Sequence, residues 1–246
     1  GSPNIVSVML ANNETGVIQP IEDIVKLSEP FDTFVHTDAI QACGKINLDW
    51  DILGVDAISL SAHKIGGPQG VGALILNRSF DLDPRFFGGG QERNYRPGTE
   101  NIPGIVGFGV AAELAADLDR NKRIESLRDE LECKILEIAP NAVIHGQRSQ
   151  RIPNTSCISM PGVLAETQIM KFDLAGIMVS AGSACSSGKV HNSHVLKAMG
   201  VKESEASSAI RISLGYDNTI DEIDYFVTQW KKVSDIASSG KLREVA

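Results

Sequence analysis

The chain has 246 residues, of which 42% are hydrophobic, and a formal net charge of -8. This length can bury one sizeable core or two modest ones. The negative charge argues against a nucleic-acid groove, because phosphate backbones require clustered Lys and Arg. No apolar run approaches the roughly 18 residues of a membrane span, so we expect neither a nucleic acid nor a membrane as partner.

The four cysteines stand at positions 43, 133, 157 and 185 and form no CxxC pair. In a chain of this size, such spacing is not typical of a disulfide scaffold. Reduced cysteines favour the cytosol, and we therefore expect a cytoplasmic protein.

The first half of the chain alternates strand-like and helix-like segments. Residues 4–11 are rich in β-branched side chains and end at the polar turn 12–16, which predicts a buried strand. A short amphipathic helix is expected from Pro20 to about Ser28. Further strands are predicted at 33–37, 55–60 and 73–76. This alternation indicates parallel βαβ units.

The second half begins with a long predicted helical region from about Pro103 to Ile138, in which the apolar residues between 124 and 138 recur at three- and four-residue spacing. After it, short strands are expected at 142–145, 155–160, 178–180 and 210–214, and helices at 165–173, 193–199 and 220–237. The pattern predicts a smaller α+β domain. We place one domain at 1–120 and the second at 121–246.

Polar residues follow three of the predicted strands. Asn13 follows the first, Asp38 ends the second, and Ser61, His63 and Lys64 follow the third. In parallel sheets, ligands bind outside the carboxyl ends of the strands. We therefore expect these side chains to converge on one edge.

Several of these residues have the types that a pyridoxal phosphate site requires, namely a lysine, an acid facing the pyridine nitrogen and phosphate donors. Lys64 stands in a polar, glycine-rich loop, and Asp38 ends an apolar strand. Gln41 can donate to a ring hydroxyl, while Ser61, His63 and Thr99 can contact phosphate. Taken singly, a strand-end Asp is most often a cap or turn residue, and the glycines can simply form a tight turn.

Six segments, in order and at similar spacing, resemble the cysteine desulfurases of the class V aminotransferase fold that serve iron–sulfur cluster assembly and nitrogen fixation. They are NNETG (12–16), HTDAIQACGK (36–45), SLSAHKIGGPQGVGAL (59–74), GGGQERNYRPGTEN (88–101), SAGSACSS (180–187) and SSAIRISLG (207–215). The resemblance implies an α/β protein of PLP-dependent transferase fold type I. It further implies a partial large domain with a mainly parallel sheet, a smaller C-terminal α+β domain, and a missing N-terminal part.

The resemblance also assigns roles around the cofactor pyridoxal 5'-phosphate. Lys64 corresponds to the residue that forms the Schiff base and shuttles protons, and His63 to a residue near the cofactor. Asp38 and Gln41 correspond to the partners of the pyridine nitrogen and the ring hydroxyl, and Ser61 to a phosphate ligand.

Three more residues match motif positions. Thr99 corresponds to a phosphate contact supplied by the other subunit, which implies a homodimer. Asn13 and Arg211 correspond to the pair that holds the substrate α-carboxylate, a task that suits the planar fork of arginine. Without its flanking motif, Arg211 would be interpreted as a salt-bridge residue.

Cys185 lies in the small-residue segment 182–188 and lacks the apolar neighbours of a structural cysteine. The resemblance implies that its thiolate takes the sulfur of L-cysteine as a persulfide, releases L-alanine, and passes the sulfur to an acceptor or iron–sulfur scaffold protein. His191 and His194 are nearby, but His-x-x-His without further ligands does not predict a metal site. Residues 189–192 read KVHN, where many relatives have an acidic residue and a proline.

Two alternatives remain open. The chain can belong to a selenocysteine lyase or a related class V enzyme, because selenium leaves by similar chemistry. It can also be an inactive truncated fragment that serves only in dimerisation or partner binding. Selenide release against sulfide release separates the first alternative from a desulfurase, and loss of cofactor binding identifies the second.

Overall fold

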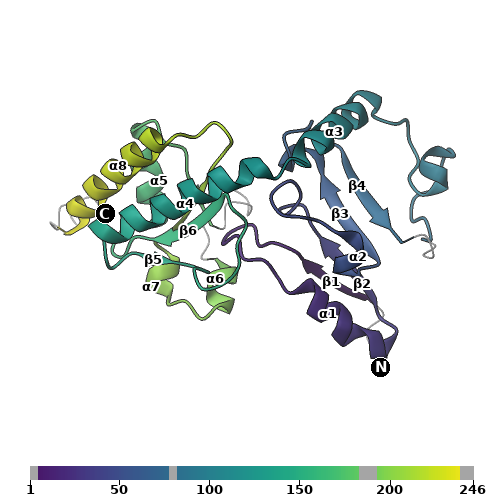
Figure 1. Ribbon diagram of the computed structural model, residues 1–246, viewed down its shortest axis with the longest axis horizontal. Coiled ribbons are helices and arrows are strands. Elements are labelled where there is room, and N and C mark those ends of the chain that lie inside the picture. The colour runs from purple at the N-terminus through teal and green to yellow at the C-terminus, as the bar shows by residue number, and fades with distance from the viewer. Residues whose placement is uncertain (1–4, 78–81, 183–192, 239–246) are drawn as a thin grey trace. The chain divides into compact units, whose positions relative to one another are not determined.

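The computed structural model describes residues 5–77, 82–182 and 193–238. The chain forms two compact units (Figure 1). The first comprises residues 1–11 and 19–118, and the second comprises residues 12–18 and 119–246. The short segment 12–18 therefore belongs with the C-terminal half of the chain, although it follows the first strand in sequence.

The first unit is built on a four-stranded sheet of β1 (Ile5–Met9), β2 (Phe34–Asp38), β3 (Ala57–Ser61) and β4 (Gly72–Leu76), in that order. The strands β1, β2 and β3 are parallel, and β4 runs antiparallel to β3. The prediction of a mainly parallel sheet is thus confirmed. The carboxyl ends of the three parallel strands share one edge.

The described helices of this unit are α1 (Ile21–Ser28), α2 (Trp50–Leu53) and α3 (Ile102–Ala115), with 3-10 turns η1 (Glu29–Phe31), η2 (Ala62–Lys64) and η3 (Gln91–Asn94). Local sequence explains their ends. The Asp49 carboxylate accepts from the N–H groups of Asp51 and Ile52 at the start of α2, and Gly54 ends it at a φ of 65°. Asn101 caps α3 in the same way through Gly104.

The region predicted to be helical over 103–138 is helical apart from a short break. Two helices occupy this region, since α3 ends at Ala115 and α4 (Asp119–Ile138) begins in the second unit. The apolar periodicity between residues 124 and 138 belongs to α4. Its residues Leu131 and Ile135 are buried, whereas α3 is apolar on all sides and leaves Val106 and Val110 more than half exposed.

The second unit has an antiparallel sheet of β5 (Val143–Ile144), β6 (Thr155–Ser159), β7 (Ser180–Ala181) and β8 (Ala209–Ser213), in the order β5-β6-β8-β7. Its other described helices are α5 (Ala165–Leu174), α6 (His194–Ala198), α7 (Glu203–Ala206) and α8 (Ile220–Ser238). Phe172, Phe226 and Trp230 stack in its core, with ring centroids 5.0 to 6.2 Å apart. This unit has the α+β architecture that we expected. None of the described helices is long and apolar enough to cross a membrane.

Candidate functional site

The carboxyl edge of the first sheet carries Asp38 and Ser61, the last residues of β2 and β3. Backbone hydrogen bonds tie the neighbouring strands together here, from Leu10 N to Asp38 O (2.8 Å) and from Ala39 N to Ser59 O (3.1 Å). The Asp38 carboxylate accepts from Ile40 N at 2.9 Å, which fixes its direction at the start of the following turn. An acid and a hydroxyl thus stand on adjacent strands at one edge.

Lys64 is exposed at the end of η2, directly after β3. Ala62, two residues earlier, is fully buried, and its carbonyl accepts from the N–H groups of Ile65 and Gly67. The Oγ of Ser61 and the Nδ1 of His63 lie 2.8 Å apart. This tight turn brings a hydroxyl, an imidazole and an exposed amine to the same edge as Asp38.

Glycine is required where β4 returns beside this turn. A Cβ on Gly72 would lie 2.7 Å from the carbonyl oxygen of Leu60, closer than any side chain tolerates against backbone. At Gly72, therefore, a side chain is excluded by the close approach of the neighbouring strand. This adds to the turn-forming role that the sequence indicated for the glycines after Lys64.

Lys45 was missed by the reasoning from sequence. Its Nζ donates to the Gln41 carbonyl at 2.8 Å, within the turn that follows Asp38. Burial, and after it the nearby charge of Lys64, together lower the pKa of Lys45 to about 8. A Cβ on Gly44 would lie 3.2 Å from Ile65 Cγ2, so this turn packs against the residue that follows Lys64. In the sequence, the one feature that pointed to Lys45 was its position as the last residue of the matching segment 36–45.

The side chains of Ser7, His36 and Ser59 form a hydrogen-bonded row across the first sheet, which the sequence did not reveal. His36 joins Ser7 on β1 to Ser59 on β3, with Nδ1 2.7 Å from the Ser7 Oγ and Nε2 2.8 Å from the Ser59 Oγ. Ser59 is the cross-strand partner of Asp38. The row ties three strands together one pleat before the candidate acid.

No side-chain hydrogen bond or ion pair joins the remaining predicted residues to Asp38, Ser61, His63 or Lys64 in the part of the chain that the structure describes. Gln41 lies half-buried in the turn after Asp38, and Thr99 is exposed in the loop before α3. Cys185 lies outside the residues that the structure describes. Asn13, which we expected at the same sheet edge, belongs to the second unit.

In the second unit, the structure brings Asn13 and Arg211 together. Arg211 stands in the middle of β8, between Cys157 of β6 and Ser180 of β7. Its Nη1 donates to the Asn13 carbonyl at 3.0 Å, and its buried Nε has no hydrogen-bond partner among the described residues. A guanidinium with an unused buried donor is suited to a carboxylate ligand.

The Asn13 turn is held rigidly. The Oδ1 of Asn12 accepts from the N–H groups of Glu14 and Thr15, both at 2.9 Å. Gly16 completes the turn at a φ of 75°, a conformation that disfavours other residues.

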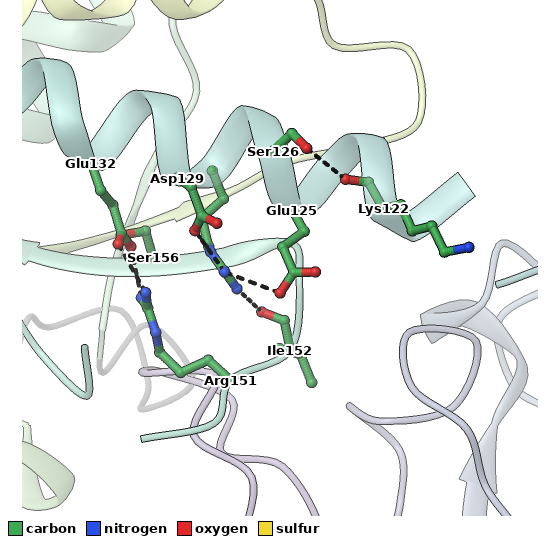
Figure 2. Close-up of polar contacts among 9 residues, drawn as sticks. Lys122, Glu125, Ser126, Asp129, Glu132, Arg151, Ile152 and Ser156 are labelled. Carbon is green, nitrogen blue, oxygen red and sulfur yellow. Dashed lines mark hydrogen bonds and ion pairs between the residues drawn. The ribbon is translucent and has the colours of Figure 1, made fainter. Parts of the chain in front are cut away.

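Polar side chains of α4 hold the segment of Arg151 to Ser156, as Figure 2 shows. Glu132 receives both Nη groups of Arg151, at 2.6 and 2.8 Å, and the hydroxyl of Ser156. Arg128 donates to the Ile152 carbonyl at 2.9 Å, and Ile152 N donates to the Gly16 carbonyl at 2.8 Å. The helix thereby fixes the segment against which the Asn13 turn rests.

A cavity of about 660 Å³ opens beside this network. Its lining residues include Glu125, Asp129 and Cys133, and none of the residues that line it was predicted for the site. Because its acidic and basic side chains are engaged with one another, it offers little chemistry for a ligand.

Comparison with known proteins identifies the family. Residues 1–226 match the model of the family described as aminotransferase class-V. A curated cysteine desulfurase of Cereibacter sphaeroides is 47% identical over 220 residues, which are 89% of this chain and 57% of that protein.

Two solved structures extend the comparison. A NifS-like protein from Rickettsia africae is 40% identical with a TM-score of 0.86, over 94% of this chain and 62% of that one. SspA in complex with cysteine is 34% identical with a TM-score of 0.68, over 85% of this chain and 58% of that one. The chain therefore spans less than two thirds of these relatives.

Proposed function

This chain belongs to the aminotransferase class-V family, and on that premise we propose that it is the part of a cysteine desulfurase that bears the cofactor lysine and the sulfur-accepting cysteine. The observation that carries the proposal is the placement of Asp38, Ser61, His63 and Lys64 at the carboxyl edge of one parallel sheet. This is the edge at which such sheets bind ligands.

The donor set at this edge fits pyridoxal 5'-phosphate. The exposed amine of Lys64 would be the attachment point for its aldehyde, Asp38 would face its pyridine nitrogen, and Gln41 its ring hydroxyl. Ser61 and His63 would hold its phosphate side, together with Thr99 of a second copy in a homodimer. When bound, this group supplies an electron sink for negative charge at the α-carbon of an amino acid.

The residues of the chain supply the proton transfers and the substrate clamp. Asp38 would keep the pyridine nitrogen protonated, and the Lys64 Nζ would take the α-proton of the substrate and return it to carbon. Arg211 and Asn13 would orient the α-carboxylate, for which the unused Nε donor of Arg211 is available.

The substrate that we propose is L-cysteine, because SspA, a relative of this chain, has been solved in complex with cysteine. The Cys185 thiolate would attack the substrate sulfur, so that a sulfur–sulfur bond forms while the carbon–sulfur bond breaks. The products are L-alanine and a Cys185 persulfide. The persulfide would then pass its sulfur to an acceptor protein such as an iron–sulfur scaffold, in the reducing cytoplasm.

The cofactor assignment can be tested directly on the purified chain. We expect a protein-bound visible absorbance band after addition of pyridoxal phosphate and removal of the excess. Lys64→Ala should abolish the band, whereas Lys122→Ala, an exposed lysine on α4, should retain it. Alanine production from cysteine should then be lost in Cys185→Ala and retained in Cys133→Ala.

A band that persists in Lys64→Ala would place the attachment at another lysine. No band in the wild-type chain would show that these residues do not hold the cofactor by themselves, and the chain would then be a dimerisation or partner-binding fragment. Release of selenide from selenocysteine without release of sulfide from cysteine would replace the desulfurase with a selenocysteine lyase.

A further inference from the structure

Glu14 is a buried carboxylate to which the proposed chemistry gives no task. Only 3% of the residue is exposed, and it directly follows Asn13 in the rigid turn held by Asn12. A buried carboxylate is costly unless it is hydrogen-bonded, so its partners indicate what it does.

The Oε2 atom of Glu14 meets two residues that are adjacent to the ends of one segment. The Ser193 hydroxyl donates to it and also accepts from Leu196 N at 3.0 Å, where α6 begins. On the other side, a Cβ built on Gly182 would lie 2.8 Å from the same oxygen. Gly182 and Ser193 are the described residues that flank segment 183–192.

The contact with Gly182 explains why a glycine stands there. An alanine would have to displace a carboxylate that is already enclosed and hydrogen-bonded to Ser193, so the displacement is not a cheap side-chain movement. Gly182 follows β7, which pairs with β8 through Ser180 and Arg211.

Gly182 and Ser193, which flank the segment, therefore lie next to the turn that carries the Asn13–Arg211 pair. Arg211 donates to the carbonyl of Asn13, and Glu14 is the next residue along the chain. A single turn thus contacts the arginine of β8, the residue after β7 and the residue before α6.

We propose that Glu14 is a positioning residue, which holds the two ends of segment 183–192 at a fixed place relative to the Asn13–Arg211 pair. This inference rests on the proposed function for its consequence, because the segment contains Cys185. The Cys185 thiolate must meet the sulfur of a substrate whose carboxylate is held by Arg211. The described residues before and after the segment are held by the same turn as that arginine, and proximity of reacting groups requires such a shared support.

The first test measures the anchor without cofactor or activity. In Glu14→Ala, we expect amide hydrogen exchange at residues 180–182 and 194–197 to become about tenfold faster or more, as loss of a hydrogen bond to a charged group implies. Glu14→Gln retains an acceptor oxygen and should restore part of the protection. Gly182→Ala should raise exchange at residues 180–182 and also at residues 194–197, although the substitution lies in the first of these stretches.

Ser193→Ala removes the N-cap of α6 as well as the contact with Glu14. A variant that removes the N-cap of another helix is therefore needed as a control. Thr219 caps α8, where its Oγ1 accepts from Glu222 N at 3.3 Å. Thr219→Ala should leave exchange at residues 180–182 unchanged, while Ser193→Ala should raise it. The effects of Glu14→Ala and Ser193→Ala should be less than additive, because both remove the same contact.

The second test measures transfer of sulfur from cysteine to Cys185. Glu14→Ala should lower kcat about tenfold with KM within about twofold, because the cysteine carboxylate is still held while the thiolate is misplaced. Glu14→Gln should recover part of kcat, which a merely structural loss of folding would not explain.

Unchanged exchange at either flank in Glu14→Ala, or strictly additive effects with Ser193→Ala, would overturn the inference. Should Glu14→Ala not fold, Gly182→Ala and Ser193→Ala decide it by the same exchange measurement. A wild-type chain that transfers no sulfur but shows the coupled exchange would refute the proposed function of this chain and leave the anchor established.

Discussion

Lys45 places an ammonium group in a largely buried turn close to a second lysine. Burial is the main cause that lowers its pKa from 10.5 to about 8, followed by the charge of Lys64, while Cys43 opposes the shift. The pKa in the folded state is below the unfolded value, so the unfolded chain binds more protons between about pH 8 and 10.5. Stability should therefore rise with pH across this window.

We expect the wild-type chain to gain up to roughly 3 kcal/mol of unfolding free energy relative to Lys45→Met between pH 8 and 10.5. The reason is that the cost of the buried charge disappears as Lys45 loses its proton in the folded state. Urea unfolding at several pH values measures this, in a Cys43→Ser background that removes the neighbouring thiol.

Lys26, exposed on α1, supplies the control, since Lys26→Met should show no such pH-dependent difference. A difference between Lys45→Met and the wild type that stays constant from pH 7 to 10.5 would mean that Lys45 remains charged in the folded chain.

Part of the candidate site could be predicted at this scale. Asp38, Ser61, His63 and Lys64 follow predicted strands, and the parallel arrangement alone brings strand ends to a common edge. Lys45 and Glu14 could not be found in this way. The burial of Lys45 depends on the packing of its turn against Ile65, and Glu14 meets a serine 179 positions further along the chain.

At the scale of elements, α4 joins the core of the second unit to the Asn13 turn. One side of the helix buries Leu131 and Ile135, while Glu132 reaches Arg151, and both of these charged side chains are only 6% exposed. Removing one partner of such a pair leaves an uncompensated buried charge, whereas replacing both with apolar groups is often tolerated.

Glu132→Ala should therefore lower the free energy of unfolding by about 3 to 5 kcal/mol, as measured by urea denaturation. Much of this loss should be recovered in Glu132→Leu combined with Arg151→Met. The exposed pair of Lys122 and Asp119 on the same helix is the matched control, and Lys122→Met should leave the urea midpoint unchanged. Equal effects of Glu132→Ala and Lys122→Met would show that the buried pair does not support the turn.

The boundaries of elements were harder to predict than their existence. Strands β1 to β4 and helix α1 fall where alternation and turn residues indicated. The break between α3 and α4 has no proline or glycine at residues 116–118 to announce it, and the apolar composition of α3 blurred the change of periodicity.

At the scale of the whole molecule, residues 12–18 leave the first unit and become part of the second. The anchoring contacts are long-range: Ile152 N donates to the Gly16 carbonyl, and Val17 pairs with Arg151. Such pairings are invisible in local patterns of a sequence, which is why a single boundary near residue 120 was the natural expectation. A consequence is that a substitution near the N-terminus should act on the C-terminal unit.

Gly16→Ala tests this consequence. Gly16 has a φ of 75°, and a Cβ there would lie 3.2 Å from both Ile152 Cγ1 and Thr155 Cβ. The strain should cost about 1 to 2 kcal/mol and should raise amide exchange in β6 and β8. Exchange in β1 and β2 should remain at the wild-type level, although these strands are closer in sequence.

Gly54→Ala is the matched control in the first unit, because Gly54 has a similar φ of 65° and a Cβ there would meet Val25 at an ordinary 3.4 Å. It should raise exchange near α2 and β2 and leave β6 and β8 unchanged. If Gly16→Ala instead loosens β1 and β2 as much as β6 and β8, the segment 12–18 is coupled to both units equally. The assignment of segment 12–18 to the second unit alone would then be wrong.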